Sequence, residues 1–355
     1  MRITMAQVAE RSGVSRAAAS FALNGKGHKL KPDTRERVKK AAEELGYRPN
    51  ASALAVSTGR FGCAALLQSI DTRRNYLTDH ILDGIEAALA KTDMHLVFAA
   101  MSDSDLTDDA NMPKFLRKCM ADGLLINYSA GIPELLSQRI ERCKIPTIWI
   151  NSKQTVNAVH PDDVAGGRIA TERLIDKGHR KIAYVDYRFP EHSESPVHYS
   201  TANREAGYAQ AMLDAGLAPL VVRPGGHLRA ESFPAFTESW LASKNAPTAA
   251  IAYNPLTARP VIMAAMCRIG KQIPRDFSIV TYHNEMLDDM GISVSTVLLP
   301  EREMGERAVE MLLSHLEHPS LRSPSVALMP RFCEGCTCAA RPVRRNSKKG
   351  IGNGE

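Results

Sequence analysis

From residue 61 onward, short apolar runs alternate with longer stretches in which apolar residues recur every three or four positions. The runs are typical of buried strands and the periodic stretches of amphipathic helices. The predicted strands form two sets of four, at 63–70, 95–101, 123–128 and 147–151, then at 181–187, 220–223, 249–254 and 277–283. Helices are predicted between them at 78–91, 112–120, 133–142, 165–177, 203–215, 233–243 and 257–269. This alternation predicts an α/β body of two doubly wound parallel-sheet lobes. A last strand pair at 296–299 and 326–329 flanks a predicted helix at 301–317 and could carry the chain between the lobes.

The first 48 residues carry helical spacing only. Thr4 and Gln7 have the spacing of a capping box, which predicts a helix that runs to about residue 12. Gly13 interrupts the chain, Ser15 can cap a second helix, and Gly25 ends that helix. Two helices joined by a short turn that contains glycine form a helix-turn-helix unit, so we predict an all-α head.

A third helix and a linker follow. The helix is predicted to start at Asp33, with Glu36 at capping-box spacing, and to stop at residue 46. Pro49 then disfavours helix, Asn50 can cap a new one, and only about two turns fit before residue 59. A helix this short is unstable alone in water, so we expect a linker that folds only when something holds it.

The second helix of the head, in the stretch VSRAAASFALNG, is rich in small side chains. In a helix-turn-helix unit this helix lies in the major groove, and small side chains at 17–19 would let it approach the base edges. Arg16 can pair with a guanine, Ser15 and Ser20 can bind phosphates or bases, and Phe21 can lie on a thymine methyl. The head residues expected at the DNA are Thr4, Ser15, Arg16, Ala17, Ser20, Phe21 and Asn24.

The charge is unevenly distributed along the chain. Residues 1–60 hold 12 lysines and arginines against 5 acidic residues, whereas residues 61–340 hold 28 against 33. Residues 341–355 hold 5 against 1 and are expected to form a basic, disordered tail. A basic module on a mildly acidic body indicates a polyanion as the partner of the module.

Membrane and redox signals are weak. No run approaches the roughly 18 apolar residues of a membrane span, and the first ten residues lack the core of a signal peptide. We therefore expect a cytoplasmic protein with no membrane partner. The seven cysteines are expected to be small buried hydrophobes in the main. Cys333, Cys336 and Cys338 could hold a metal, but they lack a second ligand pair at zinc-site spacing.

Polar residues gather where the predicted strands end. Ligands of doubly wound sheets bind beyond the carboxyl ends of the strands, and an arginine opens a helix after the loop at 198–200. A cleft between two lobes, lined with amides, hydroxyls and this arginine, suits a small polar molecule. The expected effector-binding residues are Tyr76, Asn127, Asn151, His198, Arg204, Asn254 and His283.

From residue 3 to about residue 340, the chain resembles the LacI/GalR family of bacterial transcription regulators. The head carries VAERSGVS, SFALNG, TRERV and ELGYRPN, and the body carries DGLLINY, GHRKIA, REAGY, IPRDFSIV and MGERA. The resemblance implies a homodimer that reads a near-palindromic double-stranded DNA operator. It also implies a body like the periplasmic sugar-binding proteins, with a small-molecule effector in the cleft, a sugar or sugar derivative, and it implies no cofactor and no catalytic residues.

The resemblance also divides the chain and assigns its linker. Residues 1–48 would be the DNA-binding domain, 49–60 the hinge, and 61–340 the effector-binding and dimerisation domain. Within the last, the first lobe would hold about 61–157 and 290–318, and the second about 158–289 and 319–340. Asn50, Ala53 and Val56 fall on the hinge, where the last two match positions that enter the minor groove.

The chain departs from the family at four positions. Val56 replaces the usual leucine, which predicts a shallower wedge, and Phe21 replaces a common arginine or histidine. Pro255 and His283 stand where aspartates are usual, so a sugar would lose a carboxylate acceptor at residue 283. The departures favour an acidic sugar derivative, another ligand, or a pocket that has decayed.

Two other functions remain open. An α/β enzyme is disfavoured because no dinucleotide-binding, P-loop or nucleophile-elbow motif occurs, although the histidines and glutamates at 190–198 could bind a metal. A transport binding protein could use the same body, but the attached head and the missing signal peptide disfavour it.

Overall fold

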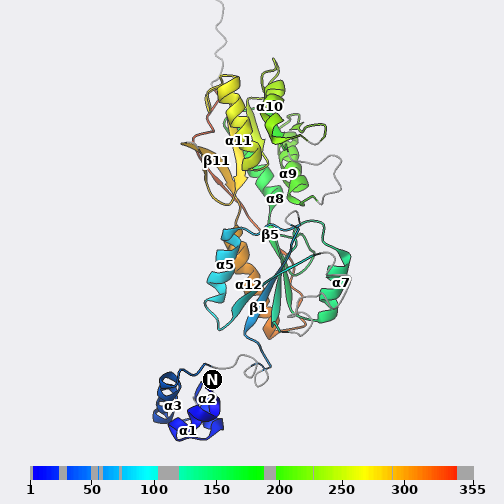
Figure 1. Cartoon of the computed structure of the whole chain (residues 1–355). Helices are drawn as coiled ribbons and strands as arrows, with labels where there is room; N and C mark the ends of the chain where they lie inside the picture. Colours follow the sequence, from blue (N-terminus) through cyan, green and yellow to red (C-terminus); the bar gives the residue numbers. More distant parts are fainter. Residues whose placement is uncertain are drawn as a thin grey trace, which may run out of the picture.

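The computed structural model describes residues 3–23, 30–48, 55, 59–71, 74–102, 120–187, 197–226, 228–289 and 291–341. A helical head precedes a body of two lobes that follow one another along its length (Figure 1). Some predictions fall outside these residues, namely the contacts at Asn24, Asn50, Ala53 and Val56, the helix at 112–119, the loop at 188–196 and the tail at 342–355.

The head is the predicted bundle of three helices, α1 (Met5–Ser12), α2 (Arg16–Leu23) and α3 (Pro32–Glu44). The predicted capping box is present, because the Thr4 side chain accepts from the Gln7 amide and the Gln7 side chain accepts from the Thr4 amide. Gly13 ends α1 in the left-handed conformation, where glycine has no steric cost. Val8 and Val38 are fully buried at the centre of the bundle.

The start of α3 differs from the prediction. The helix begins at Pro32, and Lys31 precedes it without a side-chain cap, so Asp33 lies inside the first turn. Proline has a helical φ and no amide hydrogen to satisfy, which makes the first helical position favourable for it. The Asp33 carboxylate still lies near the positive end of the helix dipole.

The first lobe is built on a parallel sheet of six strands in the order β12-β5-β4-β3-β1-β2. The strands are β1 (Cys63–Ser69), β2 (His95–Met101), β3 (Gly123–Asn127), β4 (Thr147–Ile150), β5 (Ala158–Pro161) and β12 (Val326–Leu328). Helices α5 (Asp79–Leu89) and α12 (Glu301–Glu317) pack on one face and α7 (Glu134–Cys143) on the other. β1, buried on both faces, reads as a continuous apolar run.

The second lobe is a mixed sheet in the order β10-β11-β9-β8-β6-β7, with β13 paired to β11. The strands are β6 (Ile182–Val185), β7 (Leu220–Val222), β8 (Ala249–Ala252), β9 (Ser278–His283), β10 (Leu287–Asp289), β11 (Ile292–Leu298) and β13 (Arg331–Cys333). Only β10 and β13 run antiparallel to their neighbour. Helices α8 (Asp163–Asp176) and α9 (Ser200–Asp214) cover one face, and α10 (Phe233–Leu241) and α11 (Pro255–Met263) cover the other.

The chain crosses between the lobes three times, after β5, after β11 and after β12. This division differs from the expected one. Residues 158–161 belong to the first sheet rather than the second lobe, and so do residues 326–328, whereas residues 292–298 belong to the second sheet rather than the first lobe. β5 carries a proline and spans four residues, so it lacks the pattern that marks a strand. It is defined by its pairing with the nearby β4 and with β12, which lies far along the sequence.

Two helix pairs meet at backbone contact. A Cβ at Gly84 of α5 would lie 2.0 Å from the Arg302 carbonyl oxygen of α12. A Cβ at Gly167 of α8 would lie 2.2 Å from the Arg204 carbonyl oxygen of α9, and one at Gly207 would lie 2.0 Å from the Val164 oxygen. Each lobe therefore depends on glycine at the crossing of its paired helices.

Candidate ligand cleft and DNA-contacting helix

A cavity of about 430 Å³ lies between the lobes, at the carboxyl ends of their parallel strands. Both lobes contribute to its wall: Tyr76, Asn151 and Glu301 from the first, Arg204, Asn254 and His283 from the second. Tyr253 and Tyr282 add aromatic surface beside the arginine. A cavity of this size, with a few convergent polar groups, suits a small polar ligand.

Arg204 is fixed by partners from three elements. Its Nε donates to the Asp163 carboxylate of α8 at 2.7 Å, and one terminal nitrogen donates to the Tyr253 carbonyl at 3.0 Å. The guanidinium stacks over the Tyr282 ring, 4.6 Å from its centroid. Both charged side chains are buried. Burial opposes the charge of Arg204, but the Asp163 carboxylate outweighs it and raises the pKa of the arginine. The arginine therefore reaches the cavity with its charge already paired.

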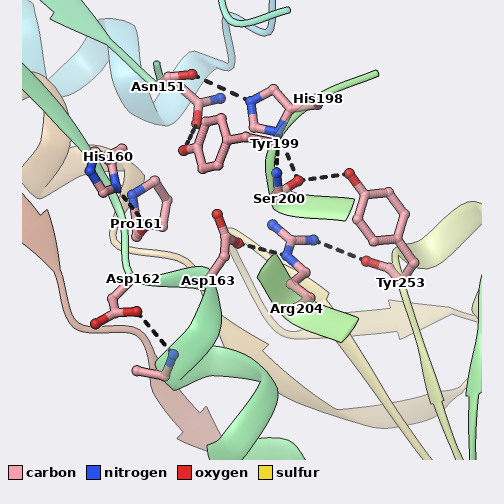
Figure 2. A network of polar contacts seen from close by, with 11 residues as sticks. Asn151, His160, Pro161, Asp162, Asp163, His198, Tyr199, Ser200, Arg204 and Tyr253 are labelled. Atoms are coloured by element: carbon pink, nitrogen blue, oxygen red, sulfur yellow. Dashed lines mark hydrogen bonds and ion pairs between the residues drawn. The ribbon is translucent and has the colours of Figure 1, made fainter. Parts of the chain in front are cut away.

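A polar network joins the lobes beside this pair (Figure 2). The Ser200 amide donates to His198 Nδ1 at 3.2 Å, so Nδ1 is an acceptor and the ring proton lies on Nε2. His198 Nε2 then donates to the Asn151 carbonyl at 3.3 Å, and the Tyr199 hydroxyl donates to Asn151 Oδ1 at 3.0 Å. Burial lowers the pKa of His198 to about 4, so the ring is neutral at neutral pH. Asn151 thus links the end of β4 to the start of α9.

The local backbone explains why asparagine occurs at residues 151 and 254. Asn151 has φ 52°, in the left-handed region that asparagine tolerates better than most residues. Asn254 caps α11, because its Oδ1 accepts from the Thr257 amide at 3.0 Å, and Pro255 takes the first helical position behind it. The departure at Pro255 therefore fits the helix start. The Asn254 oxygen is used by the cap, which leaves the amide NH₂ as its donor group.

His283 ends β9 at the wall of the cavity. Its Nδ1 accepts from the Asn284 amide at 2.8 Å. The neighbouring Asn284 side chain contacts His80 of α5 at 3.3 Å, which makes another polar contact between the lobes. The imidazole thus occupies the strand end where a carboxylate was expected in the family.

Glu301 is a cavity residue that sequence reasoning missed. It is the first residue of α12, is only 2% exposed, and accepts from the Thr78 hydroxyl at 2.5 Å. In the sequence it resembles any acidic residue in the first turn of a helix, where the helix dipole favours it. Only the crossing from β11 to α12 brings it to the cleft.

Six of the seven expected effector residues lie along the cavity, and Asn127 is the exception. Asn127 is the last residue of β3 and is fully buried. Neither of its side-chain polar atoms has a hydrogen-bond partner among the described residues. The cavity begins two residues further on, at Ser129 and Ala130, after the strand has ended. The structure therefore does not bring Asn127 to the cavity with the other six residues.

Helix α2 presents a mixed face. Ser15, Arg16, Ala17 and Phe21 are exposed, and Thr4 lies at the start of α1. The Ser15 hydroxyl caps α2 by accepting from the Ala18 amide at 3.1 Å, as expected. In contrast to the prediction for 17–19, Ala19 is fully buried among α1 and α3, so its small side chain serves the close packing of the bundle.

Comparison with known proteins shows which proteins this chain resembles. Residues 4–50 match the bacterial regulatory proteins of the lacI family, and residues 171–338 match a periplasmic binding protein-like domain. The repressor PurR of Klebsiella pneumoniae is 27% identical over 346 residues, which cover 96% of this chain and 98% of that protein. The ribose operon repressor of Haemophilus influenzae is 25% identical over 348 residues, which cover 95% and 97%. The head therefore matches the lacI-family DNA-binding domain, and the whole chain is similar to lacI-family repressors.

Solved structures of lacI-family proteins share the fold. The lac repressor dimer bound to operator and the anti-inducer ONPF has a TM-score of 0.75 at 22% identity, covering 96% of this chain and 100% of that one. The regulator CelR in complex with cellobiose has a TM-score of 0.61 at 24% identity, covering 95% and 100%. A family member from Enterococcus faecium with bound ribose has a TM-score of 0.61 at 21% identity, covering 79% and 100%.

The relatives are named transcriptional repressors, and residues 4–50 match the lacI-family head, so this chain is a DNA-binding transcriptional regulator and not an enzyme. No described helix is both long and apolar enough to cross a bilayer. Within the described part of the chain, which includes Cys333, Cys336 and Cys338, no three or more histidines, cysteines or acidic residues are grouped to hold a metal.

Proposed function

We propose that this protein binds operator DNA as a homodimer and that a small polar ligand in the cleft controls the binding. The observation that carries the proposal is a cavity with walls from two lobes that already share hydrogen bonds through Asn151, His198 and Tyr199. A ligand that contacts both walls favours the closed arrangement by its higher affinity for it. The cleft can thus convert ligand concentration into lobe geometry.

Lobe geometry would act on the DNA through the hinge at 49–60. In a dimer, the spacing of the two hinge segments decides whether both can fold in the minor groove, where Asn50, Ala53 and Val56 are proposed to lie. The exposed residues of α2 would then read the major groove. Each half-site of a near-palindromic operator would bind the head of one protomer.

The dimer is supported by the family and by an exposed apolar edge. Among the described strands, β2 has only β1 as a neighbour, and it exposes Val97 (40%) and Phe98 (53%). Ile70, which follows β1, is 62% exposed next to Met101 at the end of β2. Exposed apolar residues on a sheet edge mark an interaction surface. We place part of the dimer interface there.

The relatives named as repressors support repression as the regulatory outcome, in the cytoplasm where the DNA lies. The structural neighbours with bound cellobiose and ribose support a sugar or sugar derivative as the ligand. Repression and the ligand class belong to the proposal, as do the individual DNA and effector contacts.

The test begins with selection of duplexes from a randomised library by the full-length protein, followed by anisotropy titrations at several salt concentrations. We expect enrichment of a near-palindrome and a steep loss of affinity with salt, because the basic head displaces counterions from phosphates. Arg16→Ala should weaken operator binding by about 1–3 kcal/mol. Arg229→Ala, which removes an equal charge from an exposed site on the body, should not. Equal affinity for every duplex would refute the proposal.

A chain that lacks residues 1–60 provides the complementary test. It should lose DNA binding and keep ligand-induced thermal stabilisation, because a ligand that binds only the folded state raises its melting temperature. Loss of both properties would contradict separate head and cleft functions.

A further inference from the structure

We propose that Glu301 selects the ligand by charge, so that the cleft binds neutral or amino-bearing hydroxylated molecules and rejects sugar acids and sugar phosphates. The inference rests on the proposed function in one respect only, that the cleft is the ligand site. It replaces the expectation of an acidic sugar derivative, which was drawn from the missing carboxylate at residue 283.

The surroundings of Glu301 fix it as a hydrogen-bond acceptor. Thr78 caps α5 by accepting from the Ile81 amide at 3.3 Å, so its hydroxyl proton is free to point at Glu301 Oε2, 2.5 Å away. Burial, followed by the nearby Glu301 carboxylate, raises the pKa of the Tyr76 hydroxyl, which places the tyrosine beside Glu301 at the cavity wall. The Thr78 hydroxyl and the positive end of α12 thus both face the Glu301 side chain.

The other buried charges of the wall cancel. Arg204 and Asp163 form an ion pair with side chains 8% and 1% exposed, and their Nε and Oδ1 atoms are 2.7 Å apart. His198 is neutral, because burial lowers its pKa to about 4. Arg259, the remaining charged residue of the wall, is exposed at the rim, where water and salt screen it. Among the residues that the structure describes, the buried wall therefore carries one net negative charge, on Glu301.

This charge favours one class of ligand over another. A hydroxyl or ammonium group can donate to the carboxylate, which replaces the acceptor that the family usually has at the end of β9. A ligand carboxylate or phosphate would be desolvated beside a like charge, and Arg204 offers no unpaired charge to offset the cost. Selection by repulsion of the wrong ligand is an efficient route to specificity.

The experiment measures thermal shift and calorimetric affinity of the full-length protein at about pH 8, above the ordinary ionisation range of imidazole. The probes are matched sets of one sugar in neutral, amino, acid and phosphate form, beginning with ribose, glucose and cellobiose. Glu301→Gln keeps the shape and removes the charge. Glu303→Gln is the control, because Glu303 lies in the same turn of α12 but is exposed and outside the cavity wall.

We expect the wild type and Glu303→Gln to bind a neutral or amino sugar at least tenfold more tightly than its acid or phosphate. In Glu301→Gln that ratio should fall at least tenfold, and a cooperative thermal unfolding transition in the absence of sugar shows that the variant is folded. Acids or phosphates that bind the wild type as well as their neutral partners would overturn the inference. So would an unchanged ratio in Glu301→Gln, or no binding by any neutral or amino probe.

The inference and the proposed function fail in different ways. If sugars bind with the expected charge preference but leave operator affinity unchanged, the control function of the cleft is wrong and the role of Glu301 stands. If acids or phosphates bind equally well and do change operator affinity, the control function stands and the role of Glu301 is wrong.

Discussion

Adjacent glycines in α8 provide a sharp test of how the second lobe is packed. A Cβ at Gly167 would lie 2.2 Å from the Arg204 carbonyl oxygen and 2.8 Å from the Tyr208 amide nitrogen, both rigid backbone atoms of α9. A Cβ at Gly166 would lie 3.3 Å from the side chain of Pro330, which can move slightly. The substitutions Gly167→Ala and Gly166→Ala therefore add the same methyl group to the same helix in different surroundings.

The expected free energies follow from two terms. Alanine in place of glycine stabilises a helix interior by about 1 kcal/mol, and this gain is common to both variants. Ordinary contact begins near 3.4 Å, so Gly167→Ala requires α8 and α9 to separate by about 1.2 Å, whereas Gly166→Ala requires almost no movement. Overpacking of this kind costs about 1–3 kcal/mol or more. We expect Gly167→Ala to be less stable than Gly166→Ala by about 2 kcal/mol.

Scanning calorimetry and urea denaturation of the two full-length variants measure this difference. A difference of 2 kcal/mol corresponds to roughly 4–8 °C in Tm for a domain of this size class. Because Gly167 contacts the backbone of Arg204, Gly167→Ala should also reduce the thermal shift caused by a cleft ligand, and Gly166→Ala should retain it. Equal stabilities for the two variants would show that the helices are not in backbone contact.

Three further predictions concern pH, assembly and DNA. His198 has a folded pKa of about 4 against an ordinary value of 6.5, so the stability it contributes, about 3 kcal/mol at most, is present above pH 6.5 and lost as the pH falls toward 4. In His198→Asn the free energy of unfolding, measured by denaturation, should depend less on pH between 4 and 6.5. The control His318→Asn, which changes an exposed histidine, should keep the pH dependence of the wild type. Phe98→Asp should shift the dimer toward monomer in sedimentation equilibrium, whereas Leu213→Asp, which alters a 58% exposed leucine of the second lobe, should leave it dimeric. Phe21→Ala should reduce the discrimination among operator variants by about 1–3 kcal/mol at one base pair, and it should leave the salt dependence of binding unchanged. Competition anisotropy measures both quantities. An equal loss of affinity for all sequences would contradict a base contact by Phe21.

Local signals in the sequence predicted most of the architecture. The four strands of the first set and the capping box at Thr4 were predicted because period, length and spacing are properties of a few neighbouring residues. The short strands β5, β10 and β13 were missed because each includes polar residues and forms no apolar run, so that only pairing with a neighbouring strand defines them.

The cleft was predicted in position but only partly in chemistry. The arginine at 204 could be foreseen, but its partner Asp163 could not, because it lies 41 residues earlier and meets it only when α8 and α9 cross. Glu301 was hidden for a similar reason, since a crossing between lobes brings α12 to the cavity. Ala17 and Ala19 are alike in sequence, and only the packing of three helices decides that one is exposed and the other buried.

The three crossings between the lobes determine the order in which the body can be completed during synthesis. α12 supplies Met304, Val309 and Leu312 to the core of the first lobe, and β12 forms one edge of its sheet. Both are translated after nearly all of the second lobe, when the first five strands of the first-lobe sheet have long left the ribosome. The nascent first lobe therefore exposes an apolar sheet face and an open strand edge for more than 130 residues of elongation. A chain paused there is a natural substrate for a holdase chaperone, and truncation before residue 301 should yield aggregates rather than a folded half.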